Sequence, residues 1–339
     1  MKTKLLIKLF FIATFLIGLT ELQAQHYPVG SEGIKAGSMP SSGFTFEDEN
    51  SFYYANKMPG FNGAPEWHNG YSTFSYTQTP RLSWVSDRKV FGANFGAAIR
   101  LPIEYKETSY KTSVLGTGGG SGGFPGSPPP IPLAEVVNTV RKSGLADIQV
   151  EPVLLSWHLK RFDISTGYSF WAPTGDYDKN RLYFDNIGAG YWTHSVRLGI
   201  TWYPDSEKTW AISLLNHYDF NTEQYRTVIA DSSAPFGLGS IGTTLGNIYT
   251  LEWSVSKKIS NVNVGVTGYY QQQVTDTEGP APNGPTYKNE RIHVAGIGPE
   301  INVSSVKWGL NGSLRYAYEF SAMDHPQGHL ISLNLTKSF

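Results

Sequence analysis

The stretch TGDYDKN at 174–180 is the part of the chain that most resembles a metal-binding motif. It places Asp176, Asp178 and Asn180 at the alternate spacing of a calcium loop. Such a loop also needs glycine at its sixth position and glutamate at its twelfth. Arg181 and Ile187 hold those positions here. We therefore expect a solvated turn, with no metal ion.

Histidines and serines are numerous enough to raise the question of a hydrolase. The histidines considered are His158, His194, His217, His293, His325 and His329. No serine, histidine and acid fall where neighbouring strands would assemble a catalytic triad. His194 could serve a lipase at a membrane interface, but one polar residue at that depth is more simply hydrated. The Gly-rich run GTGGGSGG lacks the Lys-Ser/Thr of a phosphate loop. We predict no enzyme, no catalytic residue and no cofactor.

Charged side chains of both signs recur on the face of the predicted strands that would line a lumen. These residues are Arg100, Glu104, Glu151, Asp163, Arg197, His217, Asp219, Glu252, Arg291, His293, Arg315 and Glu319. Interleaved signs favour an ion-pair network that braces the wall over a selectivity ring, because a ring should carry one sign. As gates in this lumen we predict Arg100, Arg197, Glu252, Arg315 and Glu319. For capture of a solute on the outer side we predict Tyr53, Trp171, Tyr191 and Tyr269.

The segments that must position these side chains alternate between apolar and polar residues with a period of two. The pattern is clearest over 306–320, where apolar residues stand at even positions and polar residues at odd ones. Strands are predicted at 43–55, 69–79, 90–104, 146–158, 161–171, 190–203, 209–221, 248–258, 261–273, 290–302, 306–320 and 328–339. The prediction is therefore an all-β fold of about twelve strands.

The connections between these strands alternate between short and long. Short turns facing the periplasm and long loops facing outside are typical of an antiparallel up-and-down transmembrane barrel, whereas a soluble sandwich has no reason to alternate. Aromatic residues sort by strand end in the same way. At the periplasmic ends lie Trp202, Trp210, Trp308 and Phe339. At the outer ends lie Trp192, Tyr218, Phe220, Tyr249, Tyr270, Tyr316 and Tyr318. We predict a bacterial outer-membrane barrel in contact with lipid.

The composition is consistent with this class and excludes others. Lys+Arg number 27 against Asp+Glu 28, so a strongly basic nucleic-acid binder is excluded. Aromatics reach 14% while charged residues are 16%, which favours an all-β protein. Cysteine is absent, so a disulfide scaffold and a thiolate metal site are excluded.

The chain divides into three predicted parts. Residues 1–24 read as a signal peptide, with lysines before the apolar run LFFIATFLIGL and small-residue LQA at its end. Residues 25–42 are too rich in Gly and Ser for a spanning strand, and form a periplasmic segment or a plug. The barrel is predicted over 43–339, with a Gly/Pro-rich outer loop at 105–145 in which a short helix could form over 133–141. The C-terminal strand, which ends in Phe339, is expected to engage the outer-membrane barrel assembly machinery.

A series of ordered segments resembles one known family. They are GSEGIKAGSMPSSGF, GLADIQVEPVLLSW, FWAPTGDYD, NIGAGYW, ISLLNHYDFNTE, VTGYYQQQVTD, GIGPEI and YEFSAMDHPQGHLISLNLTKSF. Together they resemble the outer-membrane transporters of the MetA-pathway of phenol degradation family, itself similar to long-chain fatty-acid transporters. The sequence departs from that pattern at Asn247, where an acid is expected, and in its long loop at 105–145. The resemblance implies uptake of small hydrophobic, often aromatic, molecules.

These observations predict a passive outer-membrane channel for small hydrophobic or aromatic compounds. The alternative is a non-conducting barrel that acts as an adhesion or scaffold protein through its outer loops. A hydrophobic pocket inside the barrel would favour the channel, and a sealed lumen would favour the scaffold.

Overall fold

The computed structural model describes residues 26–60, 70–114, 134–179, 186–228, 239–279 and 291–339. These residues form strands and one 3-10 turn, Val306–Trp308, as the all-β prediction requires. The first eight strands are β1 (Gly43–Lys57), β2 (Ser72–Val90), β3 (Ala93–Arg100), β4 (Ile103–Val114), β5 (Ala134–Leu145), β6 (Ile148–His158), β7 (Phe162–Ala172) and β8 (Thr193–Trp202). The others are β9 (Trp210–Asn221), β10 (Glu223–Val228), β11 (Gly239–Thr244), β12 (Ile248–Ile259), β13 (Val262–Gln273), β14 (His293–Ser305), β15 (Leu310–Met323) and β16 (Gln327–Ser338).

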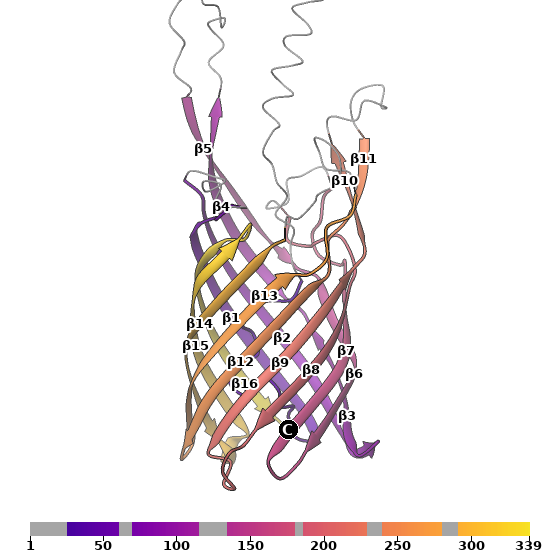
Figure 1. The fold of residues 1–339 in the computed structure, drawn as a ribbon, viewed down its shortest axis with the longest axis vertical. Helices are drawn as coiled ribbons and strands as arrows, with labels where there is room; N and C mark the ends of the chain where they lie inside the picture. Colours follow the sequence, from indigo (N-terminus) through magenta and orange to yellow (C-terminus); the bar gives the residue numbers. More distant parts are fainter. Residues whose placement is uncertain (1–25, 61–69, 115–133, 180–185, 229–238, 280–290) are drawn as a thin grey trace, which may run out of the picture.

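The main sheet closes on itself as an antiparallel barrel (Figure 1). Strand β1 pairs with β16 on one side and with β2 on the other, so the first and last strands meet. Strands β3 and β4 act as one spanning strand interrupted at 101–102, and β5 and β6 as another interrupted at 146–147. Counted in this way, the described residues form the predicted twelve-stranded barrel. Closure thus pairs the first strand with the last, while β5 pairs with β4 alone among the described strands of this sheet.

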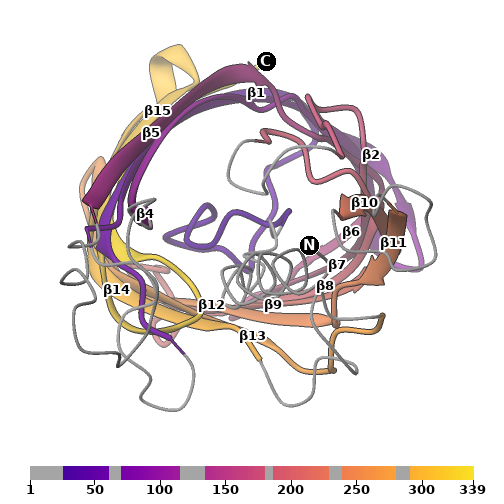
Figure 2. The same cartoon turned by 90° about the horizontal axis from the view of Figure 1, so that it is seen from above.

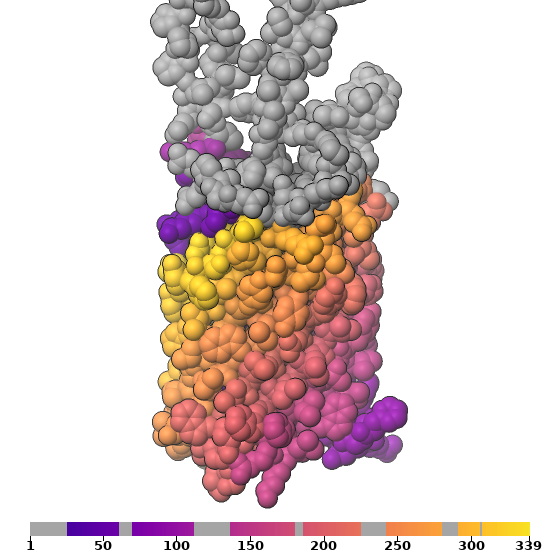
Figure 3. Space-filling model, in the orientation of Figure 1, coloured from indigo at the N-terminus to yellow at the C-terminus, as the bar shows by residue number. Residues whose placement is uncertain are grey.

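The barrel is apolar outside and polar inside, as strand β8 illustrates. Thr193, Ser195 and Thr201 are buried in the lumen, while Leu198 and Trp202 on the alternate face are 48% and 43% exposed. A period of two forces this division, since successive side chains point to opposite faces. Large apolar side chains are exposed along the strands of the barrel, and Figure 3 shows one face of the outer wall that these strands form. This distribution suits a wall that faces hydrocarbon and encloses water.

Exposed aromatic side chains mark both rims of the barrel. Trp202, Trp210 and Phe339 lie at the end where the short turns and the C-terminus gather (Figure 1). Trp192 and Phe220 lie at the opposite end. Amphipathic rings prefer the membrane interface, so the two belts follow the predicted orientation. No helix among the described residues is long and apolar enough to cross a membrane.

The second strand is longer than predicted. The expected connection at 80–89 is wrong, because β2 continues through Pro80 to Val90 and the turn falls at 91–92. Proline is tolerated here because β2 changes partner at this point, pairing with β4 up to Gln78 and with β3 from Arg81. Pro80 lies between these two sets of pairs, so the N–H that proline lacks is not needed for a regular hydrogen bond to β3 or β4.

Two segments predicted as outer loops contain hairpins. Within 105–145, β4 and β5 pair over their full lengths, so the short helix expected at 133–141 is wrong. The β-branched residues of VVNTV favour a strand there. Strands β10 and β11 form a second hairpin within the expected loop at 222–247. Both hairpins rise beyond the outer rim (Figure 1). The Gly/Pro-rich residues 115–133 and the predicted signal peptide, 1–24, lie outside the described residues.

Candidate functional site

Residues 26–42, the described part of the predicted segment 25–42, run through the lumen of the barrel. Figure 2 shows this indigo segment inside the ring of strands. Its first residue, His26, hydrogen-bonds Asp147 near the outer rim, and Ser38 donates to Asp163 near the periplasmic end of β7. The chain then enters β1 at Gly43. We call residues 26–42 the luminal segment.

Glu32 anchors the middle of the luminal segment to three arginines of the wall. It is bonded to Arg100, and its Oε1 lies 3.8 Å from Arg81 Nη1 and 4.0 Å from Arg197 Nη1. Glu151 faces the same arginines, with Oε1 2.9 Å from Arg81 Nη2 and Oε2 3.7 Å from Arg197 Nη1. Buried charges persist when they are paired in this way. The luminal segment thus supplies a carboxylate to a cluster that the wall alone leaves more positive.

Two wall carboxylates bind backbone N–H groups of the luminal segment. Glu252 accepts hydrogen bonds from Tyr27 Oη at 2.9 Å, Gly30 N at 3.0 Å and Glu32 N at 3.1 Å. Glu300 accepts from Ile34 N at 2.9 Å. The luminal segment is not part of a sheet, so its backbone N–H groups have no neighbouring strand to bind. The two carboxylates accept these hydrogen bonds instead.

Arg315 links one of these carboxylates, Glu300, to the luminal segment. Its Nε lies 3.1 Å from Glu300 Oε2, and its Nη2 donates to the carbonyl of Ser31 at 3.0 Å. Gly33 passes this pair with a φ of 61°, where a Cβ would collide with both side chains. Glycine therefore meets both a steric and a conformational need at this position.

The periplasmic half of the luminal segment lies directly on the wall at Gly37. Its N–H donates to Ser213 Oγ at 2.7 Å and its carbonyl accepts from Ser165 Oγ at 2.9 Å. A Cβ on Gly37 would come within 2.5 Å of Ile200 N, and one on Gly199 within 2.7 Å of the Gly37 Cα. Facing glycines thus let two backbones approach closely.

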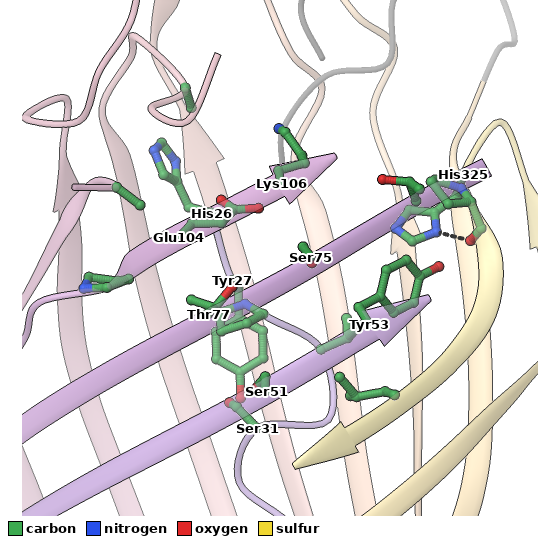
Figure 4. A pocket seen from close by; sticks show the side chains of 18 of the residues that line it. His26, Tyr27, Ser31, Ser51, Tyr53, Ser75, Thr77, Glu104, Lys106 and His325 are labelled. Carbon is green, nitrogen blue, oxygen red and sulfur yellow. Dashed lines mark hydrogen bonds between the residues drawn. The ribbon is translucent and has the colours of Figure 1, made fainter. Parts of the chain in front are cut away.

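A cavity of about 360 Å³ occupies the outer half of the lumen, beside residues 26–31 of the luminal segment (Figure 4). Its wall on β1 and β2 carries small hydroxyl side chains, and aromatic rings line other sides. The hydroxyl residues are Ser51, Thr73, Ser75, Thr77 and Thr79, and the aromatic residues are Tyr27, Tyr53, Tyr71, Trp171 and Tyr269. A concave site with apolar rings and a few polar groups is typical of small-molecule binding.

The four aromatic residues predicted for capture gather at the outer half of the lumen. Tyr53, Trp171 and Tyr269 line the cavity. Tyr191 is buried and meets the His26 ring edge-on, with centroids 4.8 Å apart. The geometry brings these residues together, and their role in capture stays a prediction.

The five predicted gate residues fall into two groups. Arg100, Arg197, Glu252 and Arg315 all contact the luminal segment. Glu319 instead lines the cavity, where it accepts hydrogen bonds from Tyr53 Oη at 2.7 Å and Tyr269 Oη at 3.0 Å. Glu319 therefore organises the aromatic wall rather than the segment.

Two residues predicted to face the lumen do not. Arg291 is exposed and its Nε lies 3.1 Å from Asp276 Oδ1, while His293 hydrogen-bonds Ser321. In β14 the buried neighbours are Ile292, just before the strand, and Val294. The inward positions at this end are thus the even ones, and the parity assigned from the sequence was wrong.

Several residues of the site were missed by reasoning from the sequence. Glu32, Arg81 and Glu300 belong to the charge clusters, and His26 and Asp147 form a pair at the outer rim. Glu32 carried one signal, as a lone acid in a Gly/Ser-rich stretch. His26 and Asp147 lie 121 residues apart and outside regular strands, so no periodic pattern could join them.

Asp147 lies beyond the last β6–β7 pair, Ile148 with Ala172, and binds donors on several sides. It accepts from Gly175 N at 2.8 Å, Ala189 N at 2.7 Å and His26 Nε2 at 2.7 Å. Burial opposes ionisation, but these hydrogen bonds and the nearby His26 hold the pKa of Asp147 below its ordinary value. The carboxylate is thus a fixed anion at the outer rim.

The described residues offer no assembled metal site, and the serine, histidine and acid that meet at the periplasmic end of β7 are not ordered as a triad. No group of three or more His, Cys, Asp or Glu side chains among them could hold a metal ion. At the periplasmic end of β7, Ser38 and His158 both contact the carboxylate of Asp163. A triad instead needs the histidine between the serine and the acid.

Comparisons with known proteins point to one family. The family model described as MetA-pathway of phenol degradation matches residues 57–335. No curated protein sequence matches the chain. The COG4313 outer membrane channel from Pseudomonas putida aligns over 92% of this chain and 100% of its own, with 12% identity and a TM-score of 0.67. At that identity the match shows a shared fold.

Two further solved structures align less closely. A Pseudomonas aeruginosa FadL homologue has 11% identity and a TM-score of 0.41, covering 90% of this chain and 92% of its own. The beta domain of the Bordetella autotransporter BrkA has 11% identity and a TM-score of 0.45, covering 88% and 100%. These TM-scores are too low to support an argument.

Proposed function

The chain belongs to the MetA-pathway of phenol degradation family and is a β-barrel of the bacterial outer membrane, and from this premise we propose that it is a passive channel for small hydrophobic or aromatic compounds. We infer that the luminal segment, which runs through the lumen, keeps this channel closed. We expect no catalytic activity. We expect the C-terminal strand, which ends near Phe339, to be recognised by the barrel assembly machinery.

The observation that carries the proposal is the cavity in the outer half of the lumen. Its volume of about 360 Å³ lies in the range of small-molecule sites. Tyr53, Trp171 and Tyr269 offer ring faces, while the hydroxyls of β1 and β2 offer hydrogen bonds. A lumen that only stiffened a scaffold would have no need of a hollow lined in this way.

Passage across the membrane requires the luminal segment to move. Below the cavity, residues 32–38 fill the space between the charge cluster and the periplasmic end of β7. The wall behind this part of the segment carries small hydroxyl residues, among them Ser165, Thr201 and Ser213. Their small side chains would leave a passage once the segment is displaced.

Solute influx into vesicles tests the proposal. Hydrophobic solutes cross phospholipid by themselves, so the vesicles need an outer leaflet of lipopolysaccharide. Benzyl alcohol and toluene would be compared with arabinose, using the wild-type protein, a variant that lacks residues 26–38, and vesicles without protein. We expect faster entry of both aromatic solutes with the wild-type protein, and faster still with the deletion.

Two results would contradict the proposal. Aromatic entry equal to that of empty vesicles, with both proteins folded, would favour the non-conducting scaffold. If the protein raised the influx of arabinose by the same factor as the influx of the aromatic solutes, relative to vesicles without protein, the barrel would be an unselective pore. Folding of each variant is checked on a denaturing gel, where a folded barrel migrates faster before heating than after heating.

A further inference from the structure

His26 fills a slot at the outer rim that has the features of a ligand site. Its ring stacks on Trp171 with centroids 5.7 Å apart and planes 12° apart, and Tyr191 meets it edge-on. Its Nε2 lies 2.7 Å from Asp147 Oδ2 and its Nδ1 lies 2.6 Å from Thr193 Oγ1. The His26 side chain is 4% exposed. The slot thus holds a flat ring on its faces and at two opposite edges.

The hydrogen-bond partners of the slot define the ligand chemistry that it selects. Asn221 Nδ2 donates to the carbonyl of Gly246, which turns Asn221 Oδ1 toward Thr193. The Thr193 hydroxyl donates to that Oδ1 at 2.6 Å, so toward His26 it is an acceptor. The ionised Asp147 is also an acceptor. Both edges of the slot therefore accept hydrogen bonds, and a ring that fills it must donate them.

The slot opens toward the cavity, where one donor is unsatisfied. His26, Asp147 and Trp171 all line the cavity. Trp171 is 3% exposed, and its Nε1 has no hydrogen-bond partner in the part of the chain that the structure describes. A buried donor without a partner carries a free-energy cost that an acceptor on a ligand would relieve. Besides the donors at its edges, a ligand with an acceptor near Trp171 Nε1 would thus bind better.

We propose that the slot formed by Trp171, Tyr191, Asp147 and Thr193 is a binding site for planar aromatic solutes that carry N–H or O–H donors, and that His26 occupies it as an internal ligand with which such solutes compete. This inference rests on the proposed function, because it names the solutes that the outer cavity would favour. A solute that takes the slot detaches His26 and with it the outer end of the luminal segment. Aromatic compounds without donors, such as toluene, would not compete.

Chemical rescue tests the slot without relying on transport of an aromatic solute. In planar bilayers, His26→Ala should raise the open probability on the order of tenfold, because a charge-assisted hydrogen bond and the stack are lost. Millimolar imidazole, supplied at a pH below about 6.5 so that both ring nitrogens carry a proton, should then lower the ion current of His26→Ala toward the wild-type level, since the protonated ring is flat and donates at two edges. Cyclohexanol and toluene should have no such effect. His329→Ala, altered on the outer face, should behave as the wild type in each solution.

The controls separate this inference from the proposed function. Rescue should vanish in a His26→Ala/Trp171→Leu protein that still shows the heated-barrel mobility shift. An imidazole effect that persists without Trp171, or that cyclohexanol reproduces, would overturn the slot. No effect of imidazole on His26→Ala would overturn it too, even if aromatic solutes still entered vesicles. Rescue without any aromatic influx would keep the slot and reject the channel proposal.

Discussion

The middle of the lumen and its outer cavity are both polar regions of one barrel, yet they differ in what their side chains bind. Arg100, Glu252 and Arg315 bind the luminal segment. In the cavity, Tyr53 and Tyr269 bind Glu319, another residue of the wall. The first region needs the segment to complete its bonds, whereas Glu319 and its two tyrosines are bonded within the wall. Outside the slot that holds His26, closure and contact with solute are therefore assigned to different residues.

Physical chemistry explains why the cluster of arginines and carboxylates lies in the filled region. Charges in a narrow lumen lose part of their hydration, so each needs a partner close by. The luminal segment supplies Glu32 and a row of backbone N–H groups, which the wall carboxylates bind. Hydroxyl and aromatic side chains lose less free energy when they line an open cavity, because water can hydrogen-bond to the hydroxyl groups and an apolar solute can pack against the rings.

The strongest test of this division is Glu32→Gln. Removing one partner from a buried cluster costs about 3–5 kcal/mol. We expect the luminal segment to leave the closed position, because Arg81, Arg100 and Arg197 would lose the carboxylate that the segment supplies and keep only Glu151 of the wall as a shared partner. The measurement is the open probability of single channels in planar bilayers.

Glu104→Gln is the matched control for this substitution. Glu104 lines the cavity and has no described contact with the luminal segment. Its substitution by glutamine therefore removes the same charge as Glu32→Gln but leaves the bonds of the segment in place. We expect its open probability to equal that of the wild type. If both variants open to the same extent, net charge in the lumen would control closure, and the division between the two regions would fail.

A smaller effect is expected from Gly37→Ala, which tests shape rather than charge. The added Cβ would approach Ile200 N to 2.5 Å, and overpacking of this kind costs about 1–3 kcal/mol. The segment should be lifted from β8 and close the channel less often, again read as open probability. Ser42→Ala, at an exposed position just before β1, should leave closure unchanged. An unchanged Gly37→Ala channel would mean that the segment is not seated there.

The barrel could be predicted from the sequence because its wall obeys a strict period. Alternation in strands such as β8 fixes which side chains face the lumen, and it placed Arg100, Arg197, Glu252 and Arg315 correctly inside. It failed for Arg291, just before β14, and for His293, at the start of that strand, where the parity assigned from the sequence was wrong. The alternation of side chains is a weak guide to which residues face the lumen at the point where a strand begins.

The luminal segment could not be predicted in the same way. It has no period, and its bonds join residues far apart, such as Gly30 with Glu252 and Ser31 with Arg315. Its excess of glycine excluded a strand but was equally consistent with a periplasmic segment. The site therefore depends on contacts that composition allows but does not specify.

The smallest expected effect comes from Tyr53→Phe, which alters the cavity alone. The change removes the hydrogen bond to Glu319 Oε2, but Glu319 keeps the bonds from Tyr269 Oη and Gly328 N. The cost should be about 1 kcal/mol, because one hydrogen bond is lost and the ring remains. We expect a modest change in benzyl alcohol influx, since a cavity hydroxyl is missing, with open probability unchanged. Glu32→Gln should do the reverse, changing open probability while leaving the preference for benzyl alcohol over toluene intact. If Tyr53→Phe opened the channel as Glu32→Gln is expected to do, the cavity wall would take part in closure, and the two regions would be one.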